Sequence, residues 1–110
     1  MLFCITAQYT PKALEAMAKT PTANRRVEFE KLLSAAGGKL VGMYATMADG
    51  PGAIAIFDAE PAVAPAVGAV VASSDGVQNF KMVRLFTMEE VIGIRQKRIQ
   101  LQSSYKSPTQ

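Results

Sequence analysis

The chain has 110 residues, of which 49% are hydrophobic and 19% charged, which is typical of one globular domain rather than of a disordered segment. It contains no histidine and one cysteine, and this excludes a Ser-His-Asp triad, His-ligated zinc or haem, and an iron–sulfur cluster held by one chain. The net charge of +3 comes from a basic C-terminal tail on a nearly neutral body, so a nucleic-acid partner is not expected.

The N-terminal part predicts a strand followed by an interrupted helix. The strand covers about residues 2–8, and its side chains alternate between two faces, of which one holds Phe3, Ile5 and Ala7 and the other Cys4, Thr6 and Gln8. Thr10 and Pro11 predict a helix start, because Thr caps free N–H groups and Pro suits the first helical position. Residues 20–22, with a central proline, are expected to interrupt this helix.

The helix is expected to resume near residue 24. Its apolar side chains recur at the spacing of a core-facing stripe, formed by Phe29, Leu32, Leu33 and Ala36. Gly37 or Gly38 then ends the helix in a left-handed conformation. Two strands, at about 40–47 and 53–58, are predicted to form a hairpin across a short Asp/Gly/Pro loop.

The C-terminal part predicts a second helix over about 61–73, a fourth strand over 77–86 and a terminal helix. The second helix is indicated by the spacing of its valines rather than by their helix propensity. Thr87 and Glu90 form a capping box that opens the terminal helix, which is expected to reach Leu101. Residues 103–110 are polar and are expected to fray.

This order of elements is β-α-β-β-α-β, which predicts an α+β, ferredoxin-like sandwich over residues 1–92 with a C-terminal helix end and tail over 93–110. Helices would cover only one face of the four-stranded antiparallel sheet. The expected strand phases give the other face a largely apolar set: Thr6, Gln8, Ala53, Ala55, Phe57, Phe80, Met82 and Phe86. Such a face is not left in water on a monomer, so a partner, the terminal helix or a ligand is expected to cover it.

Several short motifs, taken in order, resemble the GYD domain family. They are residues 37–47 (GGKLVGMYATM), 55–59 (AIFDA) and 84–87 (RLFT), and the resemblance covers about residues 3–92. It implies a fold similar to the dimeric α+β barrel proteins, in which two open sheet faces pack together, but it implies no assigned activity. The chain departs from the family where the Gly-Tyr-Asp signature is expected, because residues 48–52 read ADGPG.

The candidate ligand-binding residues are Arg84, Tyr44 and Thr6. Arg84 is either a clamp for an anion or carbonyl group between two sheets or one partner of an inter-subunit salt bridge, because a buried guanidinium needs an acceptor. Tyr44 is either a hydrogen-bond donor to a ligand or a core tyrosine. Thr6 belongs to the same predicted open face. No catalytic residue and no metal ligand is predicted.

Three further positions have a chemical and a structural interpretation. Cys4 would be a nucleophile only beside a group that stabilises its thiolate, and a small buried hydrophobe is favoured. Asp49 is either a general base or an ordinary turn residue before glycine. Arg25 and Arg26 either begin a solvated helix or frame the entrance of a cleft.

The sequence therefore predicts an oligomeric α+β barrel module that binds a small molecule or acts as an assembly unit, without a cofactor. The alternative is a small cofactor-free enzyme, isomerase or oxygenase-like, with its site between the sheets. A regulatory or nucleic-acid-associated role of the basic tail is a third alternative. A second copy of the chain is the expected partner. No apolar run approaches the roughly 20 residues of a membrane span, and with no secretory signal pattern and a single cysteine the cytoplasm is the expected location.

Overall fold

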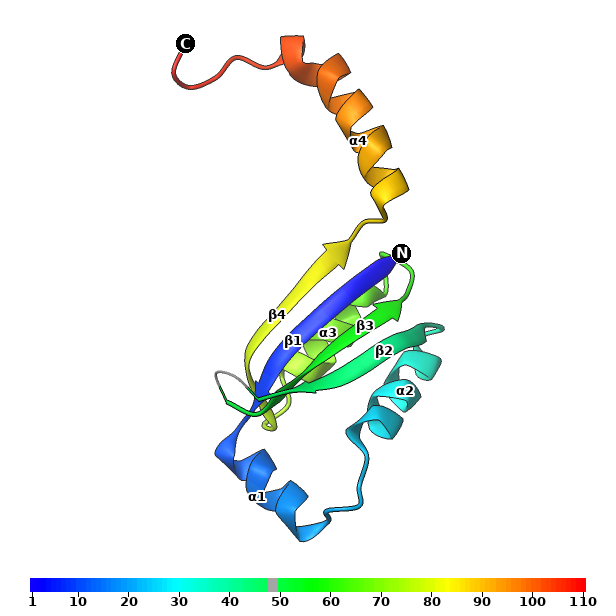
Figure 1. Cartoon of the computed structure of the whole chain (residues 1–110), viewed down its shortest axis with the longest axis vertical. Coiled ribbons are helices and arrows are strands. Elements are labelled where there is room, and N and C mark those ends of the chain that lie inside the picture. Colours follow the sequence, from blue (N-terminus) through cyan, green and yellow to red (C-terminus); the bar gives the residue numbers. More distant parts are fainter. Residues whose placement is uncertain (48–49) are drawn as a thin grey trace.

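The computed structural model describes residues 1–47 and 50–110. Four strands and four α-helices follow one another as β1 (Leu2–Tyr9), α1 (Pro11–Lys19), α2 (Arg25–Ala35), β2 (Lys39–Thr46), β3 (Gly52–Asp58), α3 (Ala64–Ala72), β4 (Val77–Leu85) and α4 (Met88–Leu101), with a 3₁₀ turn at Gln102–Ser104. The strands form one antiparallel sheet in the order β2-β3-β1-β4. Helices α2 and α3 lie on one face of it (Figure 1). This is the α+β, ferredoxin-like arrangement that the sequence predicts.

The helix boundaries follow from local chemistry. Thr10 caps α1, since its hydroxyl accepts a hydrogen bond from the Ala13 amide, and Asn24 caps α2 in the same way. Residues 20–24 separate α1 from α2, so the helix is interrupted where the proline at position 21 predicts a break. Gly37 has φ of +72°, a left-handed conformation in which it ends α2 at little steric cost.

The core lies between the sheet and helices α2 and α3. The rings of Phe3 and Phe57 are stacked with centroids 5.7 Å apart, and Phe29 meets Phe57 edge-on at 5.8 Å. Leu33 from α2 and Val67 from α3 are almost completely buried beside them. The apolar stripe predicted for α2 is confirmed, because each of its members packs in or against this cluster.

The prediction of which residues lie on the open face is wrong for β3 and for most of β4. Directly paired residues of neighbouring strands share a face, and the buried Phe3 and Ile5 pair with Phe57 and Ala55 in β3, while Ile5 pairs with Met82 in β4. Five residues that are expected on the open face therefore face the helices instead: Ala53, Ala55, Phe57, Phe80 and Met82. In β3 the cause is that odd and even positions are apolar alike, so alternation alone does not choose the buried face. In β4, Phe80 and Met82 alternate with the polar Asn79 and Lys81, a pattern that itself favours their burial against the helices.

The open face is nevertheless largely apolar. Thr6 lies on it as predicted, and it pairs with Ile54. The register places the following residues of the four strands together there: Cys4, Thr6, Tyr44, Ile54, Ile56, Val83 and one charged residue, Lys81, which pairs with Thr6. Val83 is 55% exposed and Tyr44 67% exposed. One subunit thus presents an uncovered apolar sheet face.

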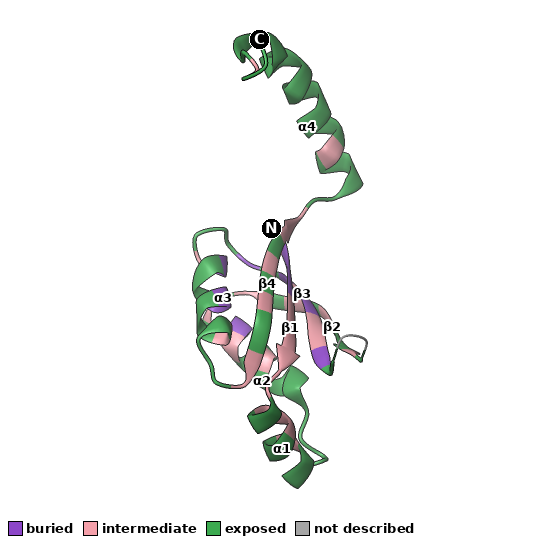
Figure 2. Ribbon diagram, turned by 90° about the vertical axis from the view of Figure 1, so that its left-hand side faces the viewer, coloured by how far each residue is buried: buried purple, intermediate pink, exposed green. Residues whose placement is uncertain are grey.

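Helix α4 projects away from the sheet, which gives the chain a length of 59 Å (Figures 1 and 2). The predicted capping box is present at its start. None of the 14 described residues of α4 is buried, although Met88, Ile92 and Ile99 are large and apolar. In the described part of the chain, no helix has the length and hydrophobicity needed to span a membrane.

Candidate functional site

A cleft of about 210 Å³ lies between the sheet and helices α2 and α3. Its floor and walls are predominantly apolar, and the contributing side chains come from all four strands and from α2 and α3: Ile5, Ala7, Phe29, Leu32, Met43, Ala53, Ala55, Val70, Val71 and Val77. The cleft is therefore built by segments that are distant in the sequence. It lies on the helix-covered face, not on the open face where the sequence placed a ligand.

The cleft exists because the sheet has small side chains at this point. Ala7 and Ala53 are paired across β1 and β3, and Ala55 follows on the same face. Farther along the same two strands, Phe3 and Phe57 fill the space between sheet and helices. Alanine side chains do not reach the helices, so the layers are filled at one end and hollow at the other.

Four polar side chains form the rim of the cleft: Tyr9, Arg25, Glu28 and Ser74. Two of them are engaged, because Glu28 Oε1 lies 3.4 Å from Lys31 Nζ and the Ser74 hydroxyl donates to the Val71 carbonyl at 2.9 Å. Tyr9 and Arg25 differ from them. Within the described residues, the Tyr9 hydroxyl makes no hydrogen bond and the Arg25 guanidinium makes no ion pair.

Tyr9 is a neutral hydrogen-bond donor at this rim. Burial raises the pKa of its hydroxyl, and the neighbouring Arg25 guanidinium opposes that rise. The position of the residue is fixed by the sheet, since its amide donates to the Pro51 carbonyl at 2.9 Å and the residue pairs with Val77. Tyr9 and Arg25 also line a neighbouring hollow next to α1, so they stand where the two spaces meet.

The three predicted ligand residues are not brought together, and the described residues that line the cleft do not include them. Thr6 and Tyr44 lie on the open face, on either side of Ile54. Arg84 pairs with Phe3 and therefore shares the opposite face. The proposed ligand roles of these residues remain predictions.

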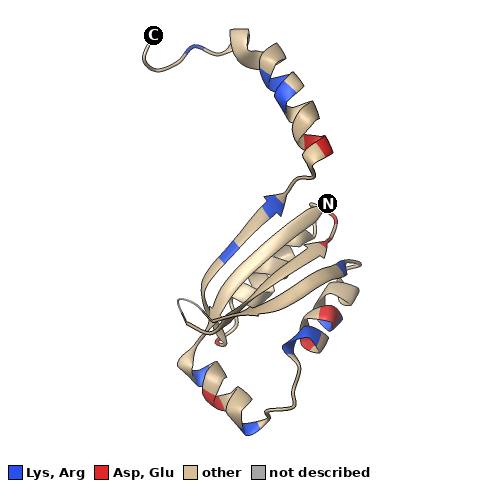
Figure 3. Cartoon of the chain, viewed as in Figure 1, with Lys and Arg blue, Asp and Glu red and all other residues tan. Residues whose placement is uncertain are grey.

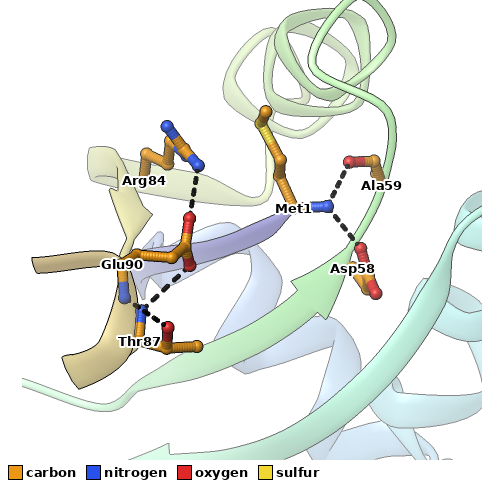
Figure 4. A network of polar contacts seen from close by, with 6 residues as sticks. All are labelled: Met1, Asp58, Ala59, Arg84, Thr87 and Glu90. Carbon is orange, nitrogen blue, oxygen red and sulfur yellow. Dashed lines mark hydrogen bonds and ion pairs between the residues drawn. The ribbon is translucent and has the colours of Figure 1, made fainter. Parts of the chain in front are cut away.

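Arg84 has an acidic partner, but this partner comes from α4. Its Nη2 lies 3.0 Å from Glu90 Oε2 (Figure 4), and its guanidinium lies over the Phe86 ring at 4.1 Å. Its Nε is buried without a hydrogen-bond partner among the described residues. Nη2 therefore has an acidic partner within the chain, at the junction of β4 and α4, whereas Nε has none among the described residues.

The structure distinguishes between the alternative roles of Cys4 and between those of Arg25 and Arg26. Burial raises the pKa of the Cys4 thiol, which agrees with a small buried hydrophobe rather than a nucleophile. Arg26 forms an ion pair with Glu30 at 2.8 Å, whereas Arg25 lines the cleft. Asp49 lies outside the described residues.

The described residues contain no group of three His, Cys, Asp or Glu side chains that could hold a metal ion. The basic residues of α4 lie away from the sheet (Figure 3). The cleft is therefore the principal candidate site of the described chain.

Neither Tyr9 nor the alanine floor was predicted from the sequence. Tyr9 immediately precedes the Thr10-Pro11 helix start, where a strand ends at the edge of the sheet. Alanines at equivalent positions of two paired strands would have been a signal, but reading it requires the register of β1 and β3. That register is not contained in either strand alone.

Comparison with known proteins identifies a family. No curated protein matches the chain. The family model of the GYD domain matches residues 3–94, a range that extends from the start of β1 into α4 and includes every element that lines the cleft. The chain therefore belongs to the GYD domain family.

Proposed function

We propose that this protein is a homo-oligomeric α+β barrel module that binds a small, predominantly apolar molecule in the cleft of each subunit. The observation that carries the proposal is the cleft itself: about 210 Å³ of space with an apolar floor and a polar rim. Concave, mostly apolar sites with a few polar groups are typical of small-molecule binding. The volume is below the roughly 300–1,000 Å³ of sites for drug-sized ligands, so the ligand is smaller.

The oligomeric part of the proposal is supported by the open face of the sheet. Cys4, Ile54, Ile56 and Val83 lie together on it, and contiguous apolar surface of this kind marks an interaction site. Packing two such faces against each other produces the dimeric α+β barrel that the family resemblance implies. An interface of about 800 Å² per subunit would be typical of a specific dimer.

Binding is tested by titrating the protein with octan-1-ol, a neutral apolar probe, and following backbone amides by NMR. The expected result is a saturable shift at Ala53, Ala55 and Val71, which line the cleft. Ala53→Leu fills the floor and should abolish the response. Ala35→Leu adds the same atoms at an exposed position of α2 and is the matched control. Shifts confined to the open face, or a full response in Ala53→Leu, would contradict the proposal.

A second candidate function is cofactor-free acid–base catalysis in the same cleft. It is favoured by one observation: Glu28 and Tyr9 both line the apolar space, where a carboxylate is a general base and a neutral phenol a general acid. The site would then lie between helices and sheet rather than between two sheets. Exchange of the α-protons of 2-octanone in D₂O measures such a base. Exchange that is catalytic in the wild type and lost in Glu28→Gln would favour the enzyme.

A further inference from the structure

We infer that the cleft selects an amphipathic carboxylate, a molecule with an apolar body and one carboxylate group, whose head group is bound by Arg25 and Tyr9. The inference rests on the proposed binding function and specifies its ligand. The apolar body would lie over the alanine floor between Phe29 and Val71. The carboxylate would remain at the rim, where it keeps part of its hydration.

The geometry places both polar residues at the same end of the cleft. Tyr9 is the last residue of β1 and Arg25 the first residue of α2, and the guanidinium is close enough to the phenol to oppose the rise of its pKa. Both also line the neighbouring hollow, so they lie where the two spaces meet, which is the entrance that the inference assigns to the ligand. A ligand entering there presents one end to both groups.

The charges at this entrance favour an anion. The acidic groups near it are engaged, because Glu28 pairs with Lys31 and Asp75, in the neighbouring hollow, pairs with Lys12. Arg25 forms no ion pair with any residue in the described ranges. A guanidinium keeps its charge and matches the two oxygens of a carboxylate. A cation entering the cleft would instead be repelled by the positive charge of Arg25.

Tyr9 supplies the second polar contact. Its hydroxyl makes no hydrogen bond with the described residues and, being neutral, it can donate to a carboxylate oxygen. Its backbone is fixed by pairing with Val77 in β4 and by the hydrogen bond of its amide to the Pro51 carbonyl, so the donor starts from a defined position in the strand. Such preorganisation lowers the entropic cost of binding.

The test compares three probes with the same apolar chain and different head groups: octanoate, octan-1-ol and octylamine. Isothermal titration calorimetry at low salt should rank octanoate first and octylamine last. Arg25→Gln should lower octanoate affinity by about five- to tenfold, the lower range for a charge-assisted contact that is open to solvent, and lower octan-1-ol affinity by much less. Tyr9→Phe should cause a smaller loss for octanoate alone. Arg26→Gln is the control, because Arg26 is engaged by Glu30.

The outcomes separate this inference from the proposed function. Equal affinities for octanoate and octan-1-ol, with no effect of Arg25→Gln, would overturn the carboxylate assignment and leave the binding function intact. A preference for octylamine would identify Glu28 as the dominant group and would also overturn it. Failure of all three probes to bind the wild-type protein would overturn both the assignment and the proposed function.

Discussion

Arg84 and Glu90 are joined by an ion pair in which Arg84 Nη2 donates to Glu90 Oε2 at 3.0 Å. The other carboxylate oxygen of Glu90 accepts from the Thr87 amide at 3.0 Å, and the Thr87 hydroxyl accepts from the Glu90 amide at 3.1 Å. One side chain therefore completes the capping box and links α4 to β4 (Figure 4). Because none of the described residues of α4 is buried, these polar contacts, rather than packing, set the start of the helix.

Replacing Glu90 with Ala should loosen the first turn of α4 without unfolding the sheet. The change removes the acceptor for the Thr87 amide and the partner of Arg84. Amide hydrogen exchange at residues 88–92 should accelerate several-fold, while exchange in β1 and β3 stays unchanged. Glu89→Ala is the control, since Glu89 lies in the same first turn but outside the capping box. Equal acceleration in both variants would show that first-turn charge, not the box, holds the helix.

The same contacts predict an acid transition in α4. The hydrogen bond from the Thr87 amide, with a contribution from Arg84, lowers the pKa of Glu90. A group with a lowered pKa in the folded state contributes stability above its unfolded pKa, about 4.3, and loses it as the pH falls through the folded value. The Thr87 amide shift should therefore stay constant from pH 8 to about 5 and change only below that range. A transition near neutral pH would contradict the assignment.

The open sheet face predicts the effect of a charge at Val83. This residue is 55% exposed in one subunit, so Val83→Asp should fold but should not assemble, because assembly would bury an unpaired carboxylate. Light scattering should give at least twice 11.8 kDa for the wild type and about the subunit mass for the variant. Val27→Asp, on the outer side of α2 and 49% exposed, is the control. A wild-type mass near 11.8 kDa would refute the oligomer.

Elements with a local chemical cause could be predicted from the sequence. Proline at position 11, the interruption at residues 20–22, glycine at position 37 and the Thr87–Glu90 box all act within a few residues. Each of these boundaries appears in the structure within a few residues of its expected position.

The buried face of β3 could not be predicted in this way. Ile54 and Ile56 are as apolar as Ala55 and Phe57, so the pattern of β3 is satisfied in either phase. In β4, Phe80 and Met82 alternate with the polar Asn79 and Lys81. A charge at Phe80 would not test assembly, because Phe80 packs against the core. Phe80→Asp should unfold the subunit instead.

The cleft could be predicted only in fragments. The sequence predicts the same two alternatives, a helix start or a cleft entrance, for Arg25 and Arg26 together. Adjacent helical residues point in different directions, however, so only one of them can face the cleft. Which of them faces the cleft depends on how α2 packs on the sheet. Tyr9 and the alanine floor depend in addition on the register of β1 with β3, a relationship between residues about 50 positions apart.

Cys4 reports independently on whether the open face is covered. Burial raises the pKa of its thiol and only 9% of the residue is exposed in one subunit, so little reactive thiolate is present near neutral pH. Alkylation by iodoacetamide at pH 8 should be slower than that of a free thiol, and slower still in the assembled protein. Diluting the protein until the assembly dissociates should accelerate alkylation. A rate that does not depend on protein concentration would mean that assembly does not cover this face.

Removing the C-terminal tail should have little effect on stability. None of the described residues from 103 to 110 is buried, and their side-chain hydrogen bonds, such as Ser107 to Thr109, are local. A chain ending at Gln102 should melt within about 3 °C of the full-length protein, since surface changes are usually within 0.5 kcal/mol.

A chain ending at Thr87 extends this test to the whole of α4. It should still form the sheet and its core, because the core cluster includes no residue after Met82. Its mass in solution then shows whether the exposed apolar residues Met88, Ile92 and Ile99 contribute to assembly. We expect the chain ending at Gln102 to keep the wild-type mass and the chain ending at Thr87 to dissociate more readily on dilution. If the chain ending at Gln102 already dissociates, the tail itself is structural and its assignment as a peripheral segment is wrong.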